Sequence, residues 1–241
     1  MPGNGAENVS AGAMVRPLTI VVPVLNEAPD IETSLRALAP LRAEGHEVVV
    51  VDGGSDDGTL AALAGLAALV DQTITAPRGR ALQMNAGALA ARGKALLFLH
   101  ADTALPPGAA SHVLAALQGG SCWGRFDLRI DGRSPLFPVI AALMNLRSRW
   151  TGIATGDQAI FVRRDAFLQV GGFPDQPLME DIELSRRLRA IARPCCLRAR
   201  VVTSGRRWER HGVLRTIGLM WLLRLRYWLG VPAAELARSY R

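Results

Sequence analysis

The chain has 241 residues, of which 49% are apolar and 20% charged, and its net charge is +7. This composition excludes disordered and collagen-like classes, and the length is enough for a sizeable core. Residues 1–120 carry 7 basic and 11 acidic side chains, whereas residues 121–241 carry 21 and 10. The basic second half indicates an anionic partner, such as a diphosphate, an acidic membrane or nucleic acid.

The first 120 residues are predicted to alternate strands with helices, after a tail over residues 1–17. Strands are predicted at residues 19–24, 47–52, 73–75 and 95–100, and helices from about 29, at about 59–69, within 79–92 and at 106–117. This alternation is typical of βαβ units. We therefore expect an α/β fold whose mainly parallel sheet is flanked by helices and binds ligands at the carboxyl ends of its strands.

After residue 120 the rhythm changes, which indicates a second subdomain over residues 121–210 within one compact unit. Strands are predicted at residues 123–130, 159–163 and 194–202, and helices at 136–150 and 178–191. We find no long linker between the two halves, so the boundary is not a tether.

The last predicted helix, at residues 213–229, is apolar on nearly every side. Arg215 and Arg226 share one face and Arg224 points away from them. Three arginines and a short length argue against a membrane span. An apolar helix must still be covered, by a membrane interface, a second copy of the chain or its own core. Its tryptophans and arginines favour the first two.

The first predicted strand runs into PVLNE at residues 23–27. Neither GxGxxG nor a P-loop stands here, which disfavours NAD enzymes and P-loop nucleoside triphosphatases. Asn26 and Glu27 can hydrogen-bond a nucleobase or ribose. Alternatively, Asn26 caps the helix that Pro29 begins.

Two further predicted strands also end in polar residues. DGGS at residues 52–55 places an acid where a ribose or base would arrive, or forms a turn with Ser55 or Asp56 capping the next helix. HAD follows at residues 100–102. Alternate residues of an extended segment point the same way, so His100 and Asp102 would face one Mg²⁺ or Mn²⁺ ion. The alternative is a helix cap.

Two later stretches suit chemistry as well as structure. Acids at residues 180–181 open a helix, where they favour its dipole. Alternatively, Asp181 has its proton affinity raised by the neighbouring Glu180 and acts as a general base. The RRW stretch at residues 206–208 offers two guanidinium groups for a diphosphate and an indole for stacking, or else a solvated basic face.

In this order, the motifs PVLNE, VDGGSDDGT, LHAD, GDQ, ED and RRW resemble family 2 glycosyltransferases of the GT-A fold over residues 18–208. They look closest to the small bacterial branch with DGGS and HAD patterns. The resemblance implies inverting transfer of a sugar from a nucleoside diphosphate sugar, most often of the UDP type, to an acceptor hydroxyl. It places the catalytic base at Asp181, with Glu180 beside it.

The resemblance also implies which residues bind the donor. The implied nucleotide-binding residues are Pro23, Leu25, Asn26, Glu27, Asp52, Gly54, Ser55, Arg80, Asn85, Ala101, Arg206, Arg207 and Trp208. The metal motif of the family falls on residues 100–102, with His100 where the first acid usually stands and Asp102 at the ligand usually kept. We therefore expect a divalent metal, Mg²⁺ or Mn²⁺.

By this resemblance, residues 18–120 form a nucleotide-sugar-binding subdomain and residues 121–210 an acceptor and catalytic subdomain. Residues 211–241 contain the C-terminal helix, which meets a membrane surface or a second copy through residues 212–230. We expect a cytoplasmic enzyme, peripheral on the inner membrane face in the first case and acting there on a lipid-linked acceptor, with no nucleic-acid partner. Two alternatives stay open: a sugar-nucleotide nucleotidyltransferase, and a non-catalytic basic module that binds membrane or nucleic acid.

Overall fold

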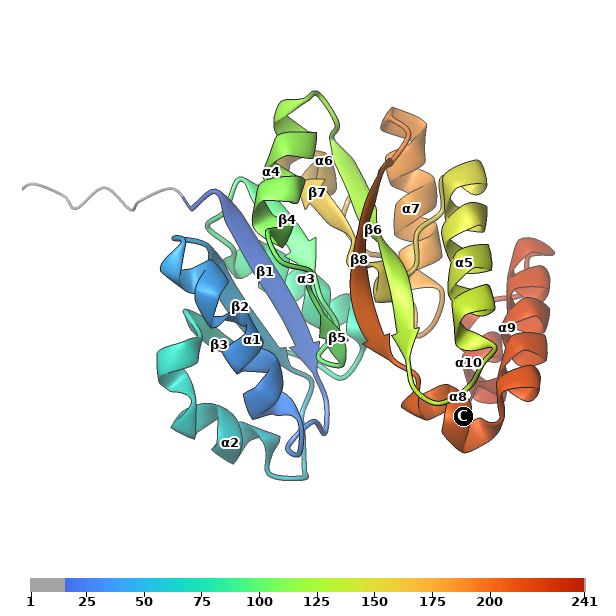
Figure 1. Cartoon of the computed structure of the whole chain (residues 1–241), viewed down its shortest axis with the longest axis horizontal. Helices are drawn as coiled ribbons and strands as arrows, with labels where there is room; N and C mark the ends of the chain where they lie inside the picture. Colours follow the sequence, from blue (N-terminus) through green and yellow to red (C-terminus); the bar gives the residue numbers. More distant parts are fainter. Residues whose placement is uncertain (1–15, 241) are drawn as a thin grey trace, which may run out of the picture.

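A computed structural model describes residues 16–240, apart from the side chain of Arg207. Its centre is a mixed, mostly parallel eight-stranded sheet in the order β3-β2-β1-β4-β7-β6-β8-β5, which confirms the expected α/β class (Figure 1). The strands are β1 Leu18–Val24, β2 Glu47–Asp52, β3 Gln72–Thr75, β4 Ala95–Phe98, β5 Thr103–Ala104, β6 Trp123–Asp131, β7 Phe161–Arg163 and β8 Cys195–Ser204.

The first four strands pair in parallel with one another, with β1 between β2 and β4. Every residue of β1 and β2 is buried, because helices cover both faces. Ile20 packs into the core that includes α1 (Ile31–Ala43), α2 (Thr59–Gly65) and α4 (Ala109–Gln118). The next residue, Val21, packs on the other face with α3 (Arg80–Ala90), α6 (Arg164–Gln169) and α7 (Glu180–Ile191). The alternation follows from the two-residue period of a strand.

The second half extends the same sheet. β7 lies antiparallel to both β4 and β6, so the sheet runs without a break across the expected boundary near residue 120. α5 (Phe137–Thr151) packs on β6 through Arg125, which is fully buried. The Arg125 guanidinium donates to Ser148 Oγ (3.1 Å), to the carbonyl oxygen of Asn145 (3.0 Å) and to Asp127. One charged side chain thus fastens α5 to the strand.

The remaining segments are short or lie near the ends. They are the 3₁₀ turns η1 (Ala67–Leu69) and η2 (Gly156–Gln158), and the helices α8 (Arg206–His211), α9 (Val213–Trp228) and α10 (Ala233–Ser239). The predicted tail over residues 1–17 falls mostly outside the described residues. Arg16 belongs to the folded part, since its guanidinium donates to the carbonyl oxygens of Gly45 (3.3 Å) and His46 (3.2 Å).

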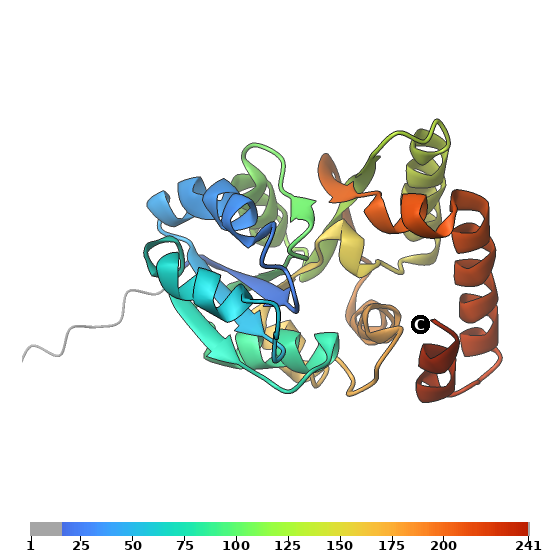
Figure 2. The same cartoon turned by 90° about the horizontal axis from the view of Figure 1, so that it is seen from below.

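α9 is covered on one face only. Leu223 is buried in a small cluster with Leu236 of α10 and with Leu178 and Met179, which precede α7 (Figure 2). The outer face stays exposed: Leu214, Trp221, Leu225 and Trp228 are 74%, 71%, 53% and 81% exposed. The protein's own core therefore accounts for only half of this helix.

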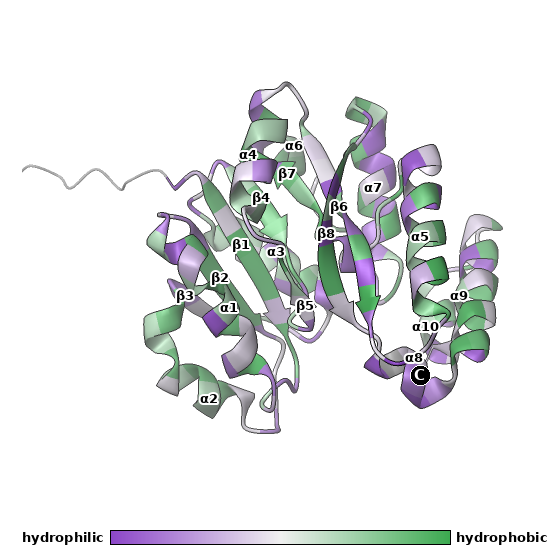
Figure 3. Ribbon diagram, viewed as in Figure 1, coloured by the Kyte–Doolittle hydropathy of each residue, from purple (hydrophilic) through white to green (hydrophobic). Residues whose placement is uncertain are grey.

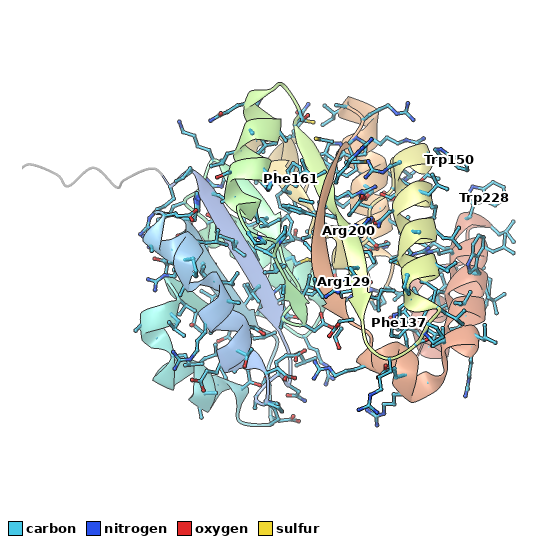
Figure 4. All side chains as sticks on the ribbon, in the orientation of Figure 1. Arg129, Phe137, Trp150, Phe161, Arg200 and Trp228 are labelled. Atoms are coloured by element: carbon cyan, nitrogen blue, oxygen red, sulfur yellow. The ribbon has the colours of Figure 1, made fainter. Side chains whose placement is uncertain are left out.

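The exposed apolar face continues onto α5. Trp150 and Trp228 both point away from the body of the molecule, on neighbouring helices (Figure 4). α5 adds Val139, Leu143 and Leu146 to the exposed apolar residues, and apolar colouring marks parts of both helices (Figure 3). Among the described residues, no helix combines the length and apolar character needed to cross a bilayer.

Candidate active site

The turn after β2 is organised by Asp52. Its side chain is fully buried, and its carboxylate accepts hydrogen bonds from the backbone nitrogens of Gly54 (2.8 Å) and Ser55 (3.0 Å) and from Ser55 Oγ (2.5 Å). Ser55 Oγ in turn accepts from the backbone nitrogen of Asn26 (2.9 Å). Asp52 thus braces this turn against the end of β1, while the Gly54 backbone is exposed.

Asn26 does not cap α1, whose N-terminal cap residue is Asp30. Instead its side chain pairs with Asp56: Asn26 Nδ2 donates to Asp56 Oδ1 (2.8 Å), and Asn26 Oδ1 accepts from the backbone nitrogen of Asp56 (3.0 Å). Asn26 adopts a left-handed conformation (φ 58°), which asparagine tolerates better than most residues. The alternative caps for α2 are also wrong, because Gly58 (φ 96°) occupies that position.

Gln83 of α3 joins the two strand ends and was missed in the sequence. Its Nε2 donates to the carbonyl oxygens of Val24 (2.7 Å) and Val51 (2.9 Å). Gly53 lies directly against it, since a Cβ there would stand 2.8 Å from the Gln83 amide carbon. A lone glutamine inside a helix carries no pattern, so only the fold reveals this contact.

The remaining residues of the first subdomain that the resemblance assigns to donor binding differ in exposure and in contacts. Pro23 and Ala101 are buried and Leu25 is half-buried. Arg80, at the start of α3, lies 3.6 Å from Glu180 through Nη1 and Oε1. Asn85 is occupied by a loop: its Nδ2 donates to the carbonyl oxygen of Phe173 (2.8 Å) and its Oδ1 accepts from the Phe173 nitrogen (2.9 Å).

The HAD stretch forms a tight turn rather than an extended segment. β4 ends at Phe98, and the backbone nitrogen of Thr103 donates to the carbonyl oxygen of His100 (3.0 Å). The premise that His100 and Asp102 point the same way is therefore wrong. His100 Nδ1 lies 3.3 Å from Asp157 Oδ1, whereas Asp102 is exposed beside α8.

Asp102 lines an open hollow of about 440 Å³ with Arg206, Arg210 and His211. Burial raises the pKa of Glu27, and so does the nearby negative charge of Asp102, while Arg206 opposes both. Arg206 Nη1 pairs with Asp30 Oδ2 at 2.5 Å. The first motif, the HAD turn and the RRW stretch therefore meet around one mixed cluster of charges.

The RRW stretch lies on α8, where the sequence suggested the end of an extended stretch. Arg206 reaches the cluster just described. The side chain of Arg207 lies outside the described part of the structure, so its implied role stays a prediction. Trp208 is half-buried and packs against the main core, so its indole has a structural role without a stacking ligand.

The acids at the start of α7 lie against the turn η2 (Gly156–Gln158), called the GDQ turn below. Asp181 Oδ2 accepts from the backbone nitrogen of Gly156 (2.8 Å). Gly156 also lies against His100, since a Cβ there would stand 2.5 Å from the imidazole Cε1 and Nε2. Because Gly156 contacts both the Asp181 carboxylate and the His100 imidazole, Asp181 lies at the same edge of the sheet as the HAD turn.

Glu180 is the acid of this pair whose pKa is raised. Its side chain is buried, and burial and the charge of Asp181 raise its pKa, with Arg80 opposing them. Asp157 behaves differently: burial alone would raise its pKa, but the hydrogen bond from His100 and the charges of Arg80 and Arg224 lower it. Asp157 therefore stays ionised beside the imidazole.

Asp102 is the residue here that suits a divalent metal. Between residues 16 and 240, no group of three or more His, Cys, Asp or Glu side chains is arranged to hold one. Mg²⁺ often needs only one or two carboxylates, because phosphates of the substrate and water complete its shell. The exposed carboxylate of Asp102, near Glu27, fits that mode, whereas His100 is engaged by the GDQ turn.

Comparisons with known proteins show the family and the fold of the chain. The family described as "Glycosyl transferase family 2" matches residues 19–171. An uncharacterized protein, MT1568 of Mycobacterium tuberculosis (strain CDC 1551 / Oshkosh), is 25% identical over 222 residues, covering 81% of this chain and 69% of that protein.

Two solved structures share the fold. S. aureus TarS 1–349 in complex with UDP-GlcNAc has a TM-score of 0.64 and 20% identity, over 78% of this chain and 58% of that one. The mannosyltransferase PcManGT from Pyrobaculum calidifontis, in complex with GDP-Man and Mn²⁺, has a TM-score of 0.60 and 22% identity, over 78% and 57%. The chain thus spans less than two thirds of these structures.

Proposed function

Because the chain belongs to glycosyl transferase family 2, we propose that it transfers a sugar from a nucleoside diphosphate sugar to an acceptor hydroxyl with inversion. The observation that carries this proposal is the meeting of strand ends and acids at one edge of the sheet. The turns after β1, β2 and β4 lie there, and the GDQ turn connects them to Asp181. The nucleotide-sugar complexes of TarS and PcManGT support a donor of this class.

The donor side of the proposed site is the hollow lined by Asp102, Arg206, Arg210 and His211. Two guanidinium groups at its rim offer charge-assisted hydrogen bonds to a diphosphate. The backbone of Gly54 and the exposed side chain of Asn26 lie at the turns nearby, where the base and ribose would bind. Asp52 contributes by holding these turns in place.

Asp181 is the proposed general base. It takes the proton of the acceptor hydroxyl, and the oxygen forms a bond to the anomeric carbon as the bond to the diphosphate breaks on the opposite face. The leaving diphosphate keeps the electron pair of that bond. The Gly156 N–H fixes one Asp181 oxygen, and the buried Glu180, whose pKa is raised, lies next to Asp181 in the chain.

The substitution Asp181→Asn tests this role. We expect sugar transfer to fall by roughly 10²–10⁴-fold, because a positioned base contributes about that much, while UDP binding is retained. Release of nucleoside diphosphate and calorimetry with UDP measure the two quantities, and the exposed Asp175→Asn serves as the matched control. Near-normal transfer by Asp181→Asn would refute the role, and release of pyrophosphate instead would favour a nucleotidyltransferase.

A divalent ion, Mg²⁺ or Mn²⁺, is proposed to bind at Asp102 together with the donor diphosphate. Such an ion offsets negative charge on the departing diphosphate. Within the chain, Asp102 supplies the exposed carboxylate and Arg206 balances the acids around it. We expect Asp102→Ala to abolish the increase in UDP affinity that Mn²⁺ gives the wild type. An unchanged manganese effect in calorimetry would remove Asp102 from the site.

The exposed apolar face of α5 and α9 is proposed to rest on an anionic lipid surface. Trp150, Trp221 and Trp228 are exposed on it, and tryptophan favours the membrane interface. The net charge of residues 121–241 complements anionic lipid. Flotation with phosphatidylglycerol vesicles tests this, and Trp228→Ser is expected to reduce it. A concentration-dependent dimer in place of flotation would identify a second copy as the occupant.

A further inference from the structure

Two arginines near the proposed base Asp181 have buried nitrogens with no hydrogen-bond partner among the described residues. Nε and Nη2 of Arg147, on α5, and Nε of Arg224, on α9, are buried and donate to no acceptor among the residues that the structure describes. Both guanidinium groups lie within range of the charge on Asp181. A buried donor left unpaired is costly, and charged donors cost most. These positions therefore call for a ligand that the chain itself does not supply.

Other arginines on or beside α5 do have partners. Arg149, two residues after Arg147 on the same helix, pairs with Asp127 Oδ2 at 2.5 Å and donates to the carbonyl oxygen of Cys196 at 3.1 Å. Arg125 is more deeply buried than either, yet it has three partners. Arg164 Nε, on α6, is also buried without a partner among the described residues. What sets Arg147 and Arg224 apart is that both lie within range of the charge on Asp181.

Arg147 and Arg224 also repel one another. Burial, and then the charge of Arg224, lower the pKa of Arg147 to about 10. Burial lowers the pKa of Arg224 as well, although Asp181 and Asp157 oppose this. An anion placed between the two guanidinium groups would relieve the repulsion and supply the missing acceptors. Paired arginines suit the planar, multiple contacts of a phosphate.

We propose that Arg147 and Arg224 bind a phosphate group of the acceptor, so that the acceptor is a phosphorylated hydroxyl compound. This inference rests on the proposed function, in which Asp181 takes the proton of the acceptor hydroxyl. The phosphate would belong to the molecule that carries this hydroxyl. The phosphate of a soluble ester and that of a lipid headgroup share the chemistry that the pair recognises.

The donor diphosphate is assigned elsewhere for a physical reason. The charges near Arg206 are those of Asp30, Asp102 and Glu27, on the side of the strand ends. The acids near Arg147 and Arg224 are Asp181 and Asp157, on the side of α7 and the GDQ turn. Arg206 and the pair Arg147 and Arg224 thus belong to different groups of charges, which suit two separate anions. Arg80, which the resemblance assigns to the donor, lies with the second group through Glu180 and Asp157.

The experiment compares Arg147→Gln and Arg224→Gln with a control on the same helix, Arg215→Gln, whose side chain is exposed. Titrations use glycerol phosphate as the soluble probe and phosphatidylglycerol vesicles as the lipid probe, with UDP titrated separately. We expect either site variant to weaken binding of the recognised probe at least about tenfold, because a charge-assisted hydrogen bond is lost. The UDP affinity of the site variants, and the affinities of the control variant for UDP and glycerol phosphate, should stay within about twofold of the wild type.

Each outcome decides the proposal. Loss limited to glycerol phosphate identifies a soluble acceptor, and loss limited to vesicles identifies a lipid headgroup. Equal binding by wild type and both variants, no binding of either probe to the wild type, or a matching loss of UDP affinity would overturn it. Arg147→Lys, which keeps the charge, guards against misfolding and should restore part of the affinity. If probe binding behaves as expected but no donor yields transfer, the phosphate site stands and the proposed function fails.

Discussion

The two sides of the proposed site are built on opposite principles. In the turns after β1 and β2, the polar side chains satisfy one another: Asp52 holds Ser55, and Asn26 holds Asp56. Around Asp181, in contrast, His100 and Arg147 each keep a buried nitrogen without a partner among the described residues. The polar groups of the first side are therefore paired within the protein, whereas those of the second side need a bound ligand to complete their hydrogen bonds.

The substitution with the largest expected effect on stability and transfer lies in the GDQ turn. Gly156→Ala would place a methyl group 2.5 Å from the His100 ring, so the turn or the imidazole must move. We expect about 1–3 kcal/mol of destabilisation, as in other overpacked cores, together with at least a tenfold loss of transfer because Asp181 loses the Gly156 N–H. Chemical denaturation and a transfer assay measure the two effects.

A matched glycine on α9 provides the control for that substitution. Gly218 has open space where a Cβ would lie, and it sits inside a helix. Gly218→Ala is therefore expected to stabilise the protein by roughly 0.5–1 kcal/mol, because alanine loses less backbone freedom than glycine. If both alanines had the same effect, the crowding at Gly156 would not be the cause.

The scaffold side is tested at Gln83, with a smaller expected effect. Gln83→Leu removes the donor to the carbonyl oxygens of Val24 and Val51 in a buried place. We expect the free energy of unfolding to fall by about 1–3 kcal/mol, with weaker UDP binding because the strand-end turns loosen. Urea denaturation and calorimetry check this. Weaker nucleotide binding with full stability would instead make Gln83 a direct contact.

The smallest expected effect is a pair of opposite pH dependences on α7. Burial first, and Asp181 second, raise the pKa of Glu180, so the folded state binds its proton more tightly than the unfolded chain. Stability is then lost as pH rises from about the ordinary glutamate pKa of 4.3 through the raised one. We expect Glu180→Gln to reduce this loss at neutral pH, as measured by denaturation across pH 4–8.

Glu183, one turn along the same helix, serves as the comparison. Its hydrogen bond from Arg186 and its contact with Arg187 lower its pKa. Its contribution to stability is therefore present above the ordinary glutamate pKa and is lost as pH falls through the lowered one. Glu183→Gln should weaken the protein at neutral pH. Substitutions that changed stability with the same sign would contradict this account of the helix.

How much the sequence could predict depends on how local each feature is. β2 was predicted with its observed bounds, because an unbroken run of valines marks a strand buried on both faces. The bond between Asn26 and Asp56 joins residues 30 positions apart, so the sequence suggested a local helix cap instead. The turn at residues 100–103 likewise follows from packing against the GDQ turn, which no local pattern records.

The phosphate site shows the same limit. Arg224 was already set apart as the arginine that points away from Arg215 and Arg226, and this was the available signal. No pattern in the sequence marked Arg147, because its helix α5 is far from α9 along the chain and lies next to it only in the folded protein (Figure 2). Residues that meet from distant segments are therefore found by structure, whereas the order of the motifs was enough to identify the family.

The bond between Asn85 and Phe173 has a consequence for motion. The Asn85 amide clamps the loop before α7 to α3, and the contact between Arg80 and Glu180 fastens the starts of the same two helices. The helix α3 and the segment that carries the proposed base are thus held together by polar contacts at two points. α8–α10 are attached to the rest of the molecule by other contacts: the apolar cluster around Leu223, the hydrogen bond from Gln176 Nε2 to the Tyr227 hydroxyl (3.3 Å) and the packing of Trp208 against the main core. We therefore expect any movement that admits an acceptor to leave α3 and α7 together.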